Sequence, residues 1–193
     1  PAGYALTDYI TYKLEKEKQF YQVGAAARIK NKTCLFYGFG KNFKTTLISI
    51  VLEGGGSYIG EEFFFLNGNR VYATIPNSHQ FDFRESHQRL MKHDLKEMRV
   101  NTSIYDFVFF IFYSNTDKVK EININEANKF ADRFRNTYNT HFYDNFKSRD
   151  FLLDRRAFAE SPILRNKTAR YFVVYFTKIE NVYRFVSQLQ AND

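Results

Sequence analysis

The chain has 193 residues, of which 44% are hydrophobic and 25% are charged, and its formal net charge at pH 7 is +7. This length and apolar content suit a globular protein and exclude a disordered or collagen-like chain. No apolar run reaches the 18 residues of a membrane span, and a single cysteine, Cys34, cannot form an internal disulfide, so we expect an intracellular protein with no membrane partner.

The first third of the chain is expected to form strands, because its apolar runs are short and separated by polar residues or glycines. The strongest local signal is the pair Asn67-Gly68. Such a pair is typical of a two-residue type I′ turn, which predicts a hairpin with Leu66 opposite Asn69. The expected strands cover residues 22–29, 33–39, 63–66 and 70–75.

Residues 43–53 form an apolar, β-branched run that three glycines follow. Lys44, Thr45 and Thr46 stand near its start, before the apolar residues, and the glycines are suited to end a helix. We interpret it as a buried helix with a glycine C-cap, and a central strand is the alternative.

The second half of the chain alternates helical and strand periodicity. Thr177 with Glu180 three residues later matches a capping box at the start of the last helix. The expected elements are a helix capped by Ser86 and reaching residue 98, a central strand at 104–113, a helix at 127–138, a strand at 169–176 and a closing helix at 179–189.

Together these elements predict an α+β fold, with a mixed or antiparallel sheet, a β-rich N-terminal part and C-terminal βα units whose amphipathic helices pack on the sheet. We treat residues 1–193 as one domain. A seam at 98–103 would instead divide the chain into a β-rich part, 1–83, and a β/α part, 84–193, and this alternative stays open.

The segment from Tyr37 to Thr46 follows a predicted strand and offers glycine, lysine and threonine, as a phosphate-binding P-loop does. A P-loop has the pattern Gly-x-x-x-x-Gly-Lys-Ser/Thr, and here Lys44 follows Phe43 instead of glycine. We therefore interpret the segment as a turn. Such a turn is suited to hold one backbone phosphate of a nucleic acid through its N–H groups and Lys41.

Basic residues and aromatic residues are interleaved in the sequence. The stretch from Lys18 to Leu52 has no acidic residue, and a second basic stretch covers 147–170. Cations neutralise phosphates and aromatic rings stack on bases, so this combination favours binding of RNA or single-stranded DNA. The residues expected to contact phosphate are Arg28, Lys30, Lys32, Lys41, Lys44, Arg165, Lys167 and Arg170, and those expected to stack on bases are Tyr37, Tyr171 and Tyr175.

The strand at 170–176 alternates Tyr171, Val173 and Tyr175 on one face with phenylalanines and valine on the other, and the strand at 104–113 repeats this aromatic pattern. Two such strands, each followed by an amphipathic helix, resemble the βα units of the RNA-recognition motif. That resemblance implies a sheet face on which exposed aromatic side chains stack on bases. Burial of both faces in a larger sheet is the alternative.

The function predicted from these patterns is non-enzymatic nucleic-acid binding, with no catalytic residue, metal or cofactor assigned. One alternative is a structural or assembly protein, such as a viral capsid, matrix or inclusion-body subunit or an adaptor, because aromatic residues make up 19% of the chain and suit interfaces with a partner or a second copy. A second alternative is a metal-dependent nuclease or hydrolase, whose ion would be held by His79, Asp82, Glu85 and His87.

Overall fold

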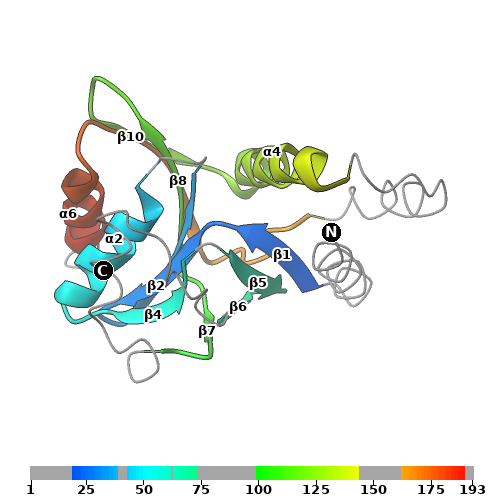
Figure 1. The fold of residues 1–193 in the computed structure, drawn as a ribbon, viewed down its shortest axis with the longest axis horizontal. Coiled ribbons are helices and arrows are strands. Elements are labelled where there is room, and N and C mark those ends of the chain that lie inside the picture. Colours follow the sequence, from blue (N-terminus) through cyan, green and yellow to red (C-terminus); the bar gives the residue numbers. More distant parts are fainter. Residues whose placement is uncertain (1–18, 39–42, 62, 74–98, 144–161, 190–193) are drawn as a thin grey trace.

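The computed structural model describes residues 19–38, 43–61, 63–73, 99–143 and 162–189 (Figure 1). Within these ranges the protein has a mixed α+β fold of ten strands and three helices, as the sequence predicted. Six strands form the main sheet and four form a smaller one. The main sheet has the order β4 (Ser57–Gly60), β2 (Ala25–Ile29), β3 (Lys32–Tyr37), β8 (Phe107–Tyr113), β10 (Arg170–Phe176) and β9 (Lys118–Ile122).

The three central strands β3, β8 and β10 run parallel, and the strands outside them are antiparallel to their neighbours. The smaller sheet is antiparallel throughout. Its order is β1 (Gln19–Val23), β5 (Phe63–Asn67), β6 (Arg70–Tyr72) and β7 (Thr102–Ile104).

Gly24 is the point at which the chain passes from the smaller sheet into the main one. A Cβ atom at this position would lie 2.7 Å from the carbonyl oxygen of Phe36 and 2.8 Å from the ring of Phe64. Both distances are too short for ordinary contacts. Glycine therefore allows β1 and β2 to follow each other directly while they belong to different sheets.

Helices cover both faces of the main sheet. Helices α2 (Lys44–Glu53) and α6 (Ile179–Leu189) lie on one face, and α4 (Ile124–Tyr143) lies on the other (Figure 1). The smaller sheet adds to the cover on the α4 side, where its side chains share one apolar cluster with α4. In α6 the buried residues are Ile179, Val182 and Val186, the spacing expected for one helical face.

Strand β8 lies inside the sheet and is apolar on both faces. Phe107, Phe109 and Ile111 pack toward α2 and α6, whereas Val108 and Phe110 pack toward α4. All five are at most 2% exposed. A parallel strand whose two faces are both covered has a continuous apolar sequence for this reason. The sequence correctly predicted that this strand lies inside the sheet and not at its edge.

The hairpin register differs from the one that the sequence predicted. The strands β5 and β6 pair Asn67 with Arg70 and Leu66 with Val71, so the two-residue turn is Gly68-Asn69 rather than Asn67-Gly68. Of these two turn residues only Gly68 has a positive φ, of 62°. A type I′ turn needs a positive φ at both positions, and glycine at the first position suits a type II′ turn instead.

The remaining predicted elements match the structure to different degrees. Residues 43–53 do contain a helix, and the N–H of Gly54 and Gly56 bond to the carbonyls of Ile50 and Val51 at its end. The run 104–113 is split, because Thr102–Ile104 joins the smaller sheet and Phe107 starts β8. The strands β4 and β9 were not predicted. The helix expected at 86–98 lies outside the described residues.

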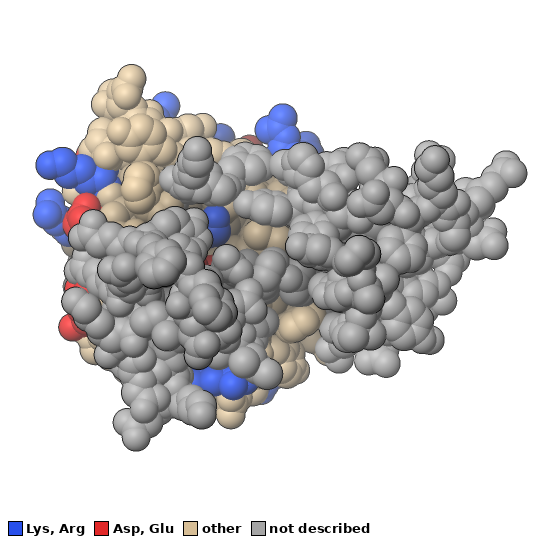
Figure 2. Space-filling model, viewed as in Figure 1, with Lys and Arg blue, Asp and Glu red and all other residues tan. Residues whose placement is uncertain are grey.

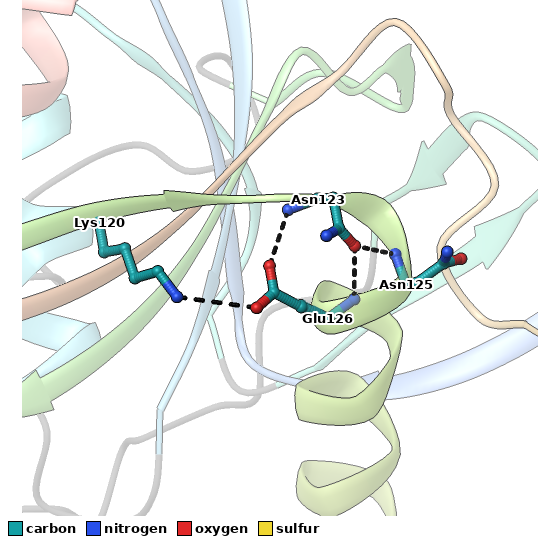
Figure 3. A network of polar contacts seen from close by, with 4 residues as sticks. All are labelled: Lys120, Asn123, Asn125 and Glu126. Carbon is teal, nitrogen blue, oxygen red and sulfur yellow. Dashed lines mark hydrogen bonds and ion pairs between the residues drawn. The ribbon is translucent and has the colours of Figure 1, made fainter.

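A capping box does form, but at the start of α4 (Figure 3). Asn123 Oδ1 accepts hydrogen bonds from the N–H of Asn125 and of Glu126, both at 3.0 Å, and Glu126 Oε2 accepts one from the N–H of Asn123 at 3.2 Å. Lys120 Nζ lies 3.7 Å from the same carboxylate. The capping box expected at Thr177 was wrong, because that residue bonds to Asp117 through its N–H and its hydroxyl.

No helix of the described part of the chain is both long enough and apolar enough to cross a membrane.

Candidate functional site

The carboxyl ends of three parallel strands point toward one edge of the main sheet, here called the carboxyl edge. Tyr37 ends β3 opposite Phe110 of β8, and Tyr113 ends β8 opposite Phe176, the last residue of β10. In open sheets with parallel strands, ligands bind outside the carboxyl ends, where the connections leave the sheet. This edge is therefore the expected place for a ligand site.

The connection from β3 to α2 leaves the sheet at this edge. Gly38 follows β3, residues 39–42 lie outside the described part, and Phe43 precedes the helix. Phe43 has φ 55° and ψ 24°, a left-handed conformation that costs a residue other than glycine roughly 1 kcal/mol. Its carbonyl accepts the first helical hydrogen bond, from the N–H of Leu47 at 2.9 Å. The N–H groups of the first turn of α2 thus begin at the carboxyl edge.

Lys44, the first residue of α2, folds back toward the end of β3. Its Nζ donates a hydrogen bond of 2.7 Å to the carbonyl oxygen of Gly38. The ammonium group therefore joins the two ends of the connection and lies beside the start of the helix. The first turn of α2 holds no acidic residue, so both the helix dipole and the ammonium make this place positive.

Thr45, the next residue, reaches a buried carboxylate. Its hydroxyl bonds to Oε1 of Glu61, which follows β4 and is only 4% exposed. A carboxylate near a helix N-terminus is stabilised by the helix dipole, and its own negative charge offsets part of the positive charge at this place. A hydroxyl and a carboxylate are also ligand types that Mg²⁺ prefers. Across the described ranges, however, no group of three or more His, Cys, Asp or Glu side chains is placed to hold a metal ion.

Two exposed aromatic rings lie at the same edge. Phe43 is 49% exposed and Tyr113 is 60% exposed, and their ring centroids are 6.2 Å apart. The ring of Phe176, which is buried, lies 6.4 Å from the first and 6.0 Å from the second, in a T-shaped arrangement with each. The carboxyl edge thus combines a helix start, an ammonium group and two exposed aromatic rings.

Two of the three tyrosines expected to stack on bases belong to the core instead. Tyr37 is fully buried and Tyr171 is 3% exposed, so neither ring has a face open to a base. Tyr37 packs against the rings of Phe64 and Phe110. The prediction for these two residues was wrong because helices and the smaller sheet cover both faces of the main sheet. The face proposed from the RNA-recognition-motif resemblance is covered for the same reason. Tyr175 is 39% exposed and stacks on Phe112.

The pKa values of the buried tyrosines follow from this placement. Burial raises the pKa of Tyr37 well above its ordinary value, and the neighbouring Tyr105 and Tyr171 raise it further. Burial, and then Tyr105, raises the pKa of Tyr171 as well. The hydroxyl of Tyr171 donates to the carbonyl of Asn166 at 2.5 Å, whereas that of Tyr37 is buried without a hydrogen-bond partner among the described residues. The rings of both tyrosines belong to the core, and their hydroxyl groups are not placed for chemistry.

Most of the predicted phosphate contacts gather at the opposite edge, where β3, β8 and β10 begin; we call it the amino edge. Arg165 is held there because its N–H bonds to the hydroxyl of Tyr105, two residues before β8. Both basic stretches of the sequence contribute to this edge. Its basic residues are Arg28, Lys30, Lys32, Arg165, Lys167 and Arg170.

Several of these cations already have neighbours in the protein. Arg170 forms a two-pronged ion pair with Glu121, with both distances at 2.9 Å, and the hydrogen bond from its guanidinium lowers the pKa of that carboxyl group. Its guanidinium also lies 5.2 Å from the ring centroid of Phe172. Lys32 Nζ lies 5.9 Å from the ring centroid of Phe107. The Nε atom of Arg28 is buried and has no hydrogen-bond partner in the part of the chain that the structure describes.

The predicted site residues are therefore divided between two edges of the main sheet. Lys32 begins β3 and Tyr37 ends it, which separates the edges by about 17 Å at 3.3 Å per residue. Lys44 lies at the carboxyl edge, away from the other basic residues, and Lys41 lies outside the described residues. On the face in Figure 2, the visible Lys and Arg side chains of the described part are dispersed and do not form one patch.

The sequence missed four residues of the carboxyl edge: Phe43, Thr45, Glu61 and Tyr113. The signal for the first two was present, because a strand, a glycine and then Lys-Thr at the start of a helix is the order of a phosphate-binding loop. Glu61 carried no such signal, since its approach to Thr45 depends on how β4 follows α2.

Comparison with known proteins adds little to this description. No protein-family model and no curated protein matches the chain. A solved structure titled as the HPr(Ser) kinase/phosphatase from Coxiella burnetii is similar in fold, with a TM-score of 0.45 and 8% sequence identity over 89% of this chain and 94% of that one. A likeness this distant carries no argument about function.

Proposed function

We propose that this protein binds a phosphate-bearing ligand at the carboxyl edge of the main sheet, with the start of α2 and the side chain of Lys44 contacting the phosphate. The observation that carries this proposal is the position of Lys44 Nζ, 2.7 Å from the carbonyl of Gly38 at the other end of the connection. The ammonium group belongs to the first residue of α2 and is held at the end of β3, so it adds its charge to the partial charge of the first N–H groups of that helix. Together these groups suit an anion.

The spacing of the sequence supports this proposal. Counted from Gly38, four residues and then Phe43 precede Lys44-Thr45, which is the spacing of the P-loop pattern with phenylalanine at the second glycine. That glycine position calls for backbone freedom, and Phe43 has the positive φ that glycine adopts without strain. The departure from the P-loop pattern therefore concerns the side chain, whereas the backbone has a glycine-like conformation.

Calorimetric titration of the full chain with tripolyphosphate tests the proposal, with citrate as a control polyanion at the same ionic strength. We expect saturable binding of tripolyphosphate and much weaker binding of citrate, because helix N–H groups and an ammonium suit compact phosphate oxygens. Equal binding of both anions would show only a general attraction to a basic protein. That result, or no binding of tripolyphosphate, would contradict the proposal.

A second candidate function is binding of RNA or single-stranded DNA at the amino edge, as the sequence predicted. The specific observation in its favour is that the two basic stretches, which are far apart in the chain, join at this edge. Anisotropy of labelled oligonucleotides tests it, because each phosphate contact contributes a slope of about −0.7 in log affinity against log salt. Lys32→Met and Lys167→Met are expected to reduce that slope, and Lys44→Met is not. Binding that does not depend on salt would refute it.

A metal-dependent nuclease or hydrolase and an assembly protein both stay predictions from the sequence. The four residues suggested for a nuclease metal site, His79, Asp82, Glu85 and His87, lie outside the described part. The assembly role and the intracellular location rest on composition alone.

A further inference from the structure

Phe43 combines two features that are each unfavourable. Its backbone is in the left-handed region, where glycine would be free of strain, and 49% of its side chain is exposed to water. A residue that is strained and exposed at the rim of a candidate site is a reason to look for a functional role. The ring, and not the backbone, is what phenylalanine adds at this position.

The ring of Phe43 does not stand alone. Tyr113, at the end of β8, places its own ring 6.2 Å away at an interplanar angle of 52°. Phe176, which is 1% exposed, contacts both rings in a T-shaped arrangement. The two outer rings are therefore held in place by a buried ring, while about half of each side chain stays exposed to water.

These rings lie beside the proposed phosphate site. Phe43 and Lys44 are consecutive, so their Cα atoms are about 3.8 Å apart. Lys44 turns back to Gly38, and Phe43 turns toward the end of β8. Phe43 therefore connects the aromatic surface directly to the helix start at which a phosphate would bind.

Building on the proposed phosphate site, we propose that Phe43 and Tyr113 form a stacking surface for a nucleobase, so that the ligand is a nucleotide. A flat base that stacks on one of the two rings meets the other at an angle, because the rings are tilted by 52°. Its phosphates meet the helix start and Lys44, so a nucleotide matches both the aromatic surface and the cationic group. An acidic peptide would match the charge but offers no flat ring beside it. Stacking on rings without a directed hydrogen bond tolerates every base, so we expect a modest preference for the larger purines.

The test compares ATP with tripolyphosphate on the full chain, by calorimetry. Both ligands carry three linked phosphates, and only ATP carries a base. We expect ATP to bind about tenfold more tightly than tripolyphosphate, the size typical for stacking of one base. Phe43→Leu and Tyr113→Thr are each expected to remove most of this advantage while tripolyphosphate binding stays unchanged. Tyr72→Thr, which removes an exposed tyrosine from the smaller sheet, is the matched control.

Each outcome distinguishes the stacking surface from the phosphate site. If tripolyphosphate binds and ATP binds no more tightly, the stacking surface is refuted and the phosphate site stands. If Phe43→Leu and Tyr113→Thr keep the full advantage of ATP, a base binds elsewhere and the inference is equally refuted. If neither ligand binds the wild type, the phosphate site fails and the stacking surface with it. Unchanged tripolyphosphate binding also shows that each variant is folded.

Discussion

Replacement of Lys44 by methionine separates a ligand-binding role from a structural one. A hydrogen bond to a charged group contributes about 1.5–3 kcal/mol, so loss of the ammonium should weaken phosphate binding about 10- to 150-fold. The stability of the free protein should fall by less than this. The variant loses the hydrogen bond from its ammonium to the Gly38 carbonyl, worth about 1.5–3 kcal/mol because the donor is charged. It also removes a positive charge from a helix N-terminus, which returns about 0.3–1 kcal/mol.

Thermal unfolding with and without tripolyphosphate measures both effects. At a ligand concentration of 100 Kd the wild type should gain about 2.7 kcal/mol, which corresponds to about 5–11 °C in Tm for a chain of this size. At the same concentration Lys44→Met should retain only about 0.3–1.4 kcal/mol of that gain. Its Tm without ligand should fall by about 1–11 °C, which corresponds to a net loss of about 0.5–2.7 kcal/mol.

Lys167→Met is the control for this experiment, because it removes an exposed lysine at the opposite edge of the sheet. It should keep the full ligand-induced shift. If Lys44→Met also kept the full shift, Lys44 would not contact phosphate. If it instead lowered Tm without ligand by roughly 15 °C or more, its bond to Gly38 would be mainly structural and the reasoning would be refuted.

Three further predictions concern the stability of the fold. Tyr37→Phe should leave stability at pH 7 unchanged or raise it by up to about 1 kcal/mol, because it removes a buried hydroxyl without a partner, whereas Tyr171→Phe should lower it by about 1 kcal/mol. Burial raises the pKa values of Tyr37 and Tyr171 above the ordinary 10.0, so the wild type should lose stability as pH rises above about 10. Tyr37→Phe should lessen that loss. Urea unfolding at pH 7 and pH 10.5 measures the loss, and an equal loss in the wild type and in Tyr37→Phe would contradict the prediction. Gly24→Ala should cost about 1–3 kcal/mol in the same assay, because the new Cβ would lie 2.7 Å from a carbonyl oxygen, and a neutral result would show that the bend can relax. Arg170→Met should cost less than about 1 kcal/mol, since its ion pair with Glu121 is half-exposed. Because the pKa of Glu121 is lowered, the stabilisation from this ion pair should be present above pH 4.5 and disappear as pH falls below it. If Arg170→Met costs the same stability at every pH, the ion pair is not the cause of that cost.

Local patterns predicted the type of most elements, because periodicity and end signals are properties of neighbouring residues. The apolar face of α6 and the glycines after α2 are signals of this kind, and both are borne out. The strand β9 was missed because four of its five residues are exposed, so it lacks the apolar alternation of a half-buried strand. The hairpin register was wrong by one residue because Asn67-Gly68 and Gly68-Asn69 are both acceptable turns, and pairing beyond the turn decides between them.

Neighbours in the main sheet could not be predicted, because they depend on contacts between distant parts of the chain. β3 and β10 lie on either side of β8, although about 130 residues separate them in the sequence. This arrangement brings Lys32 and Lys167 to one edge and leaves Lys44 at the other. Sequence proximity had placed Lys32 and Lys44 in a single basic stretch, which the fold divides by the length of a strand.

The aromatic residues show why period-two alternation was insufficient for the site. Alternation assigns side chains to two faces of a strand, but it does not say which face is open, and here both are covered. In a covered parallel sheet, solvent reaches the strands at their ends and not along their faces. The aromatic rings available to a ligand are therefore those at the strand ends or in the connections that follow, and Tyr113 and Phe43 occupy such positions beside a helix N-terminus. A strand end is not sufficient by itself, because Tyr37 also ends its strand and its ring lies inside the core, under Phe64 of the smaller sheet.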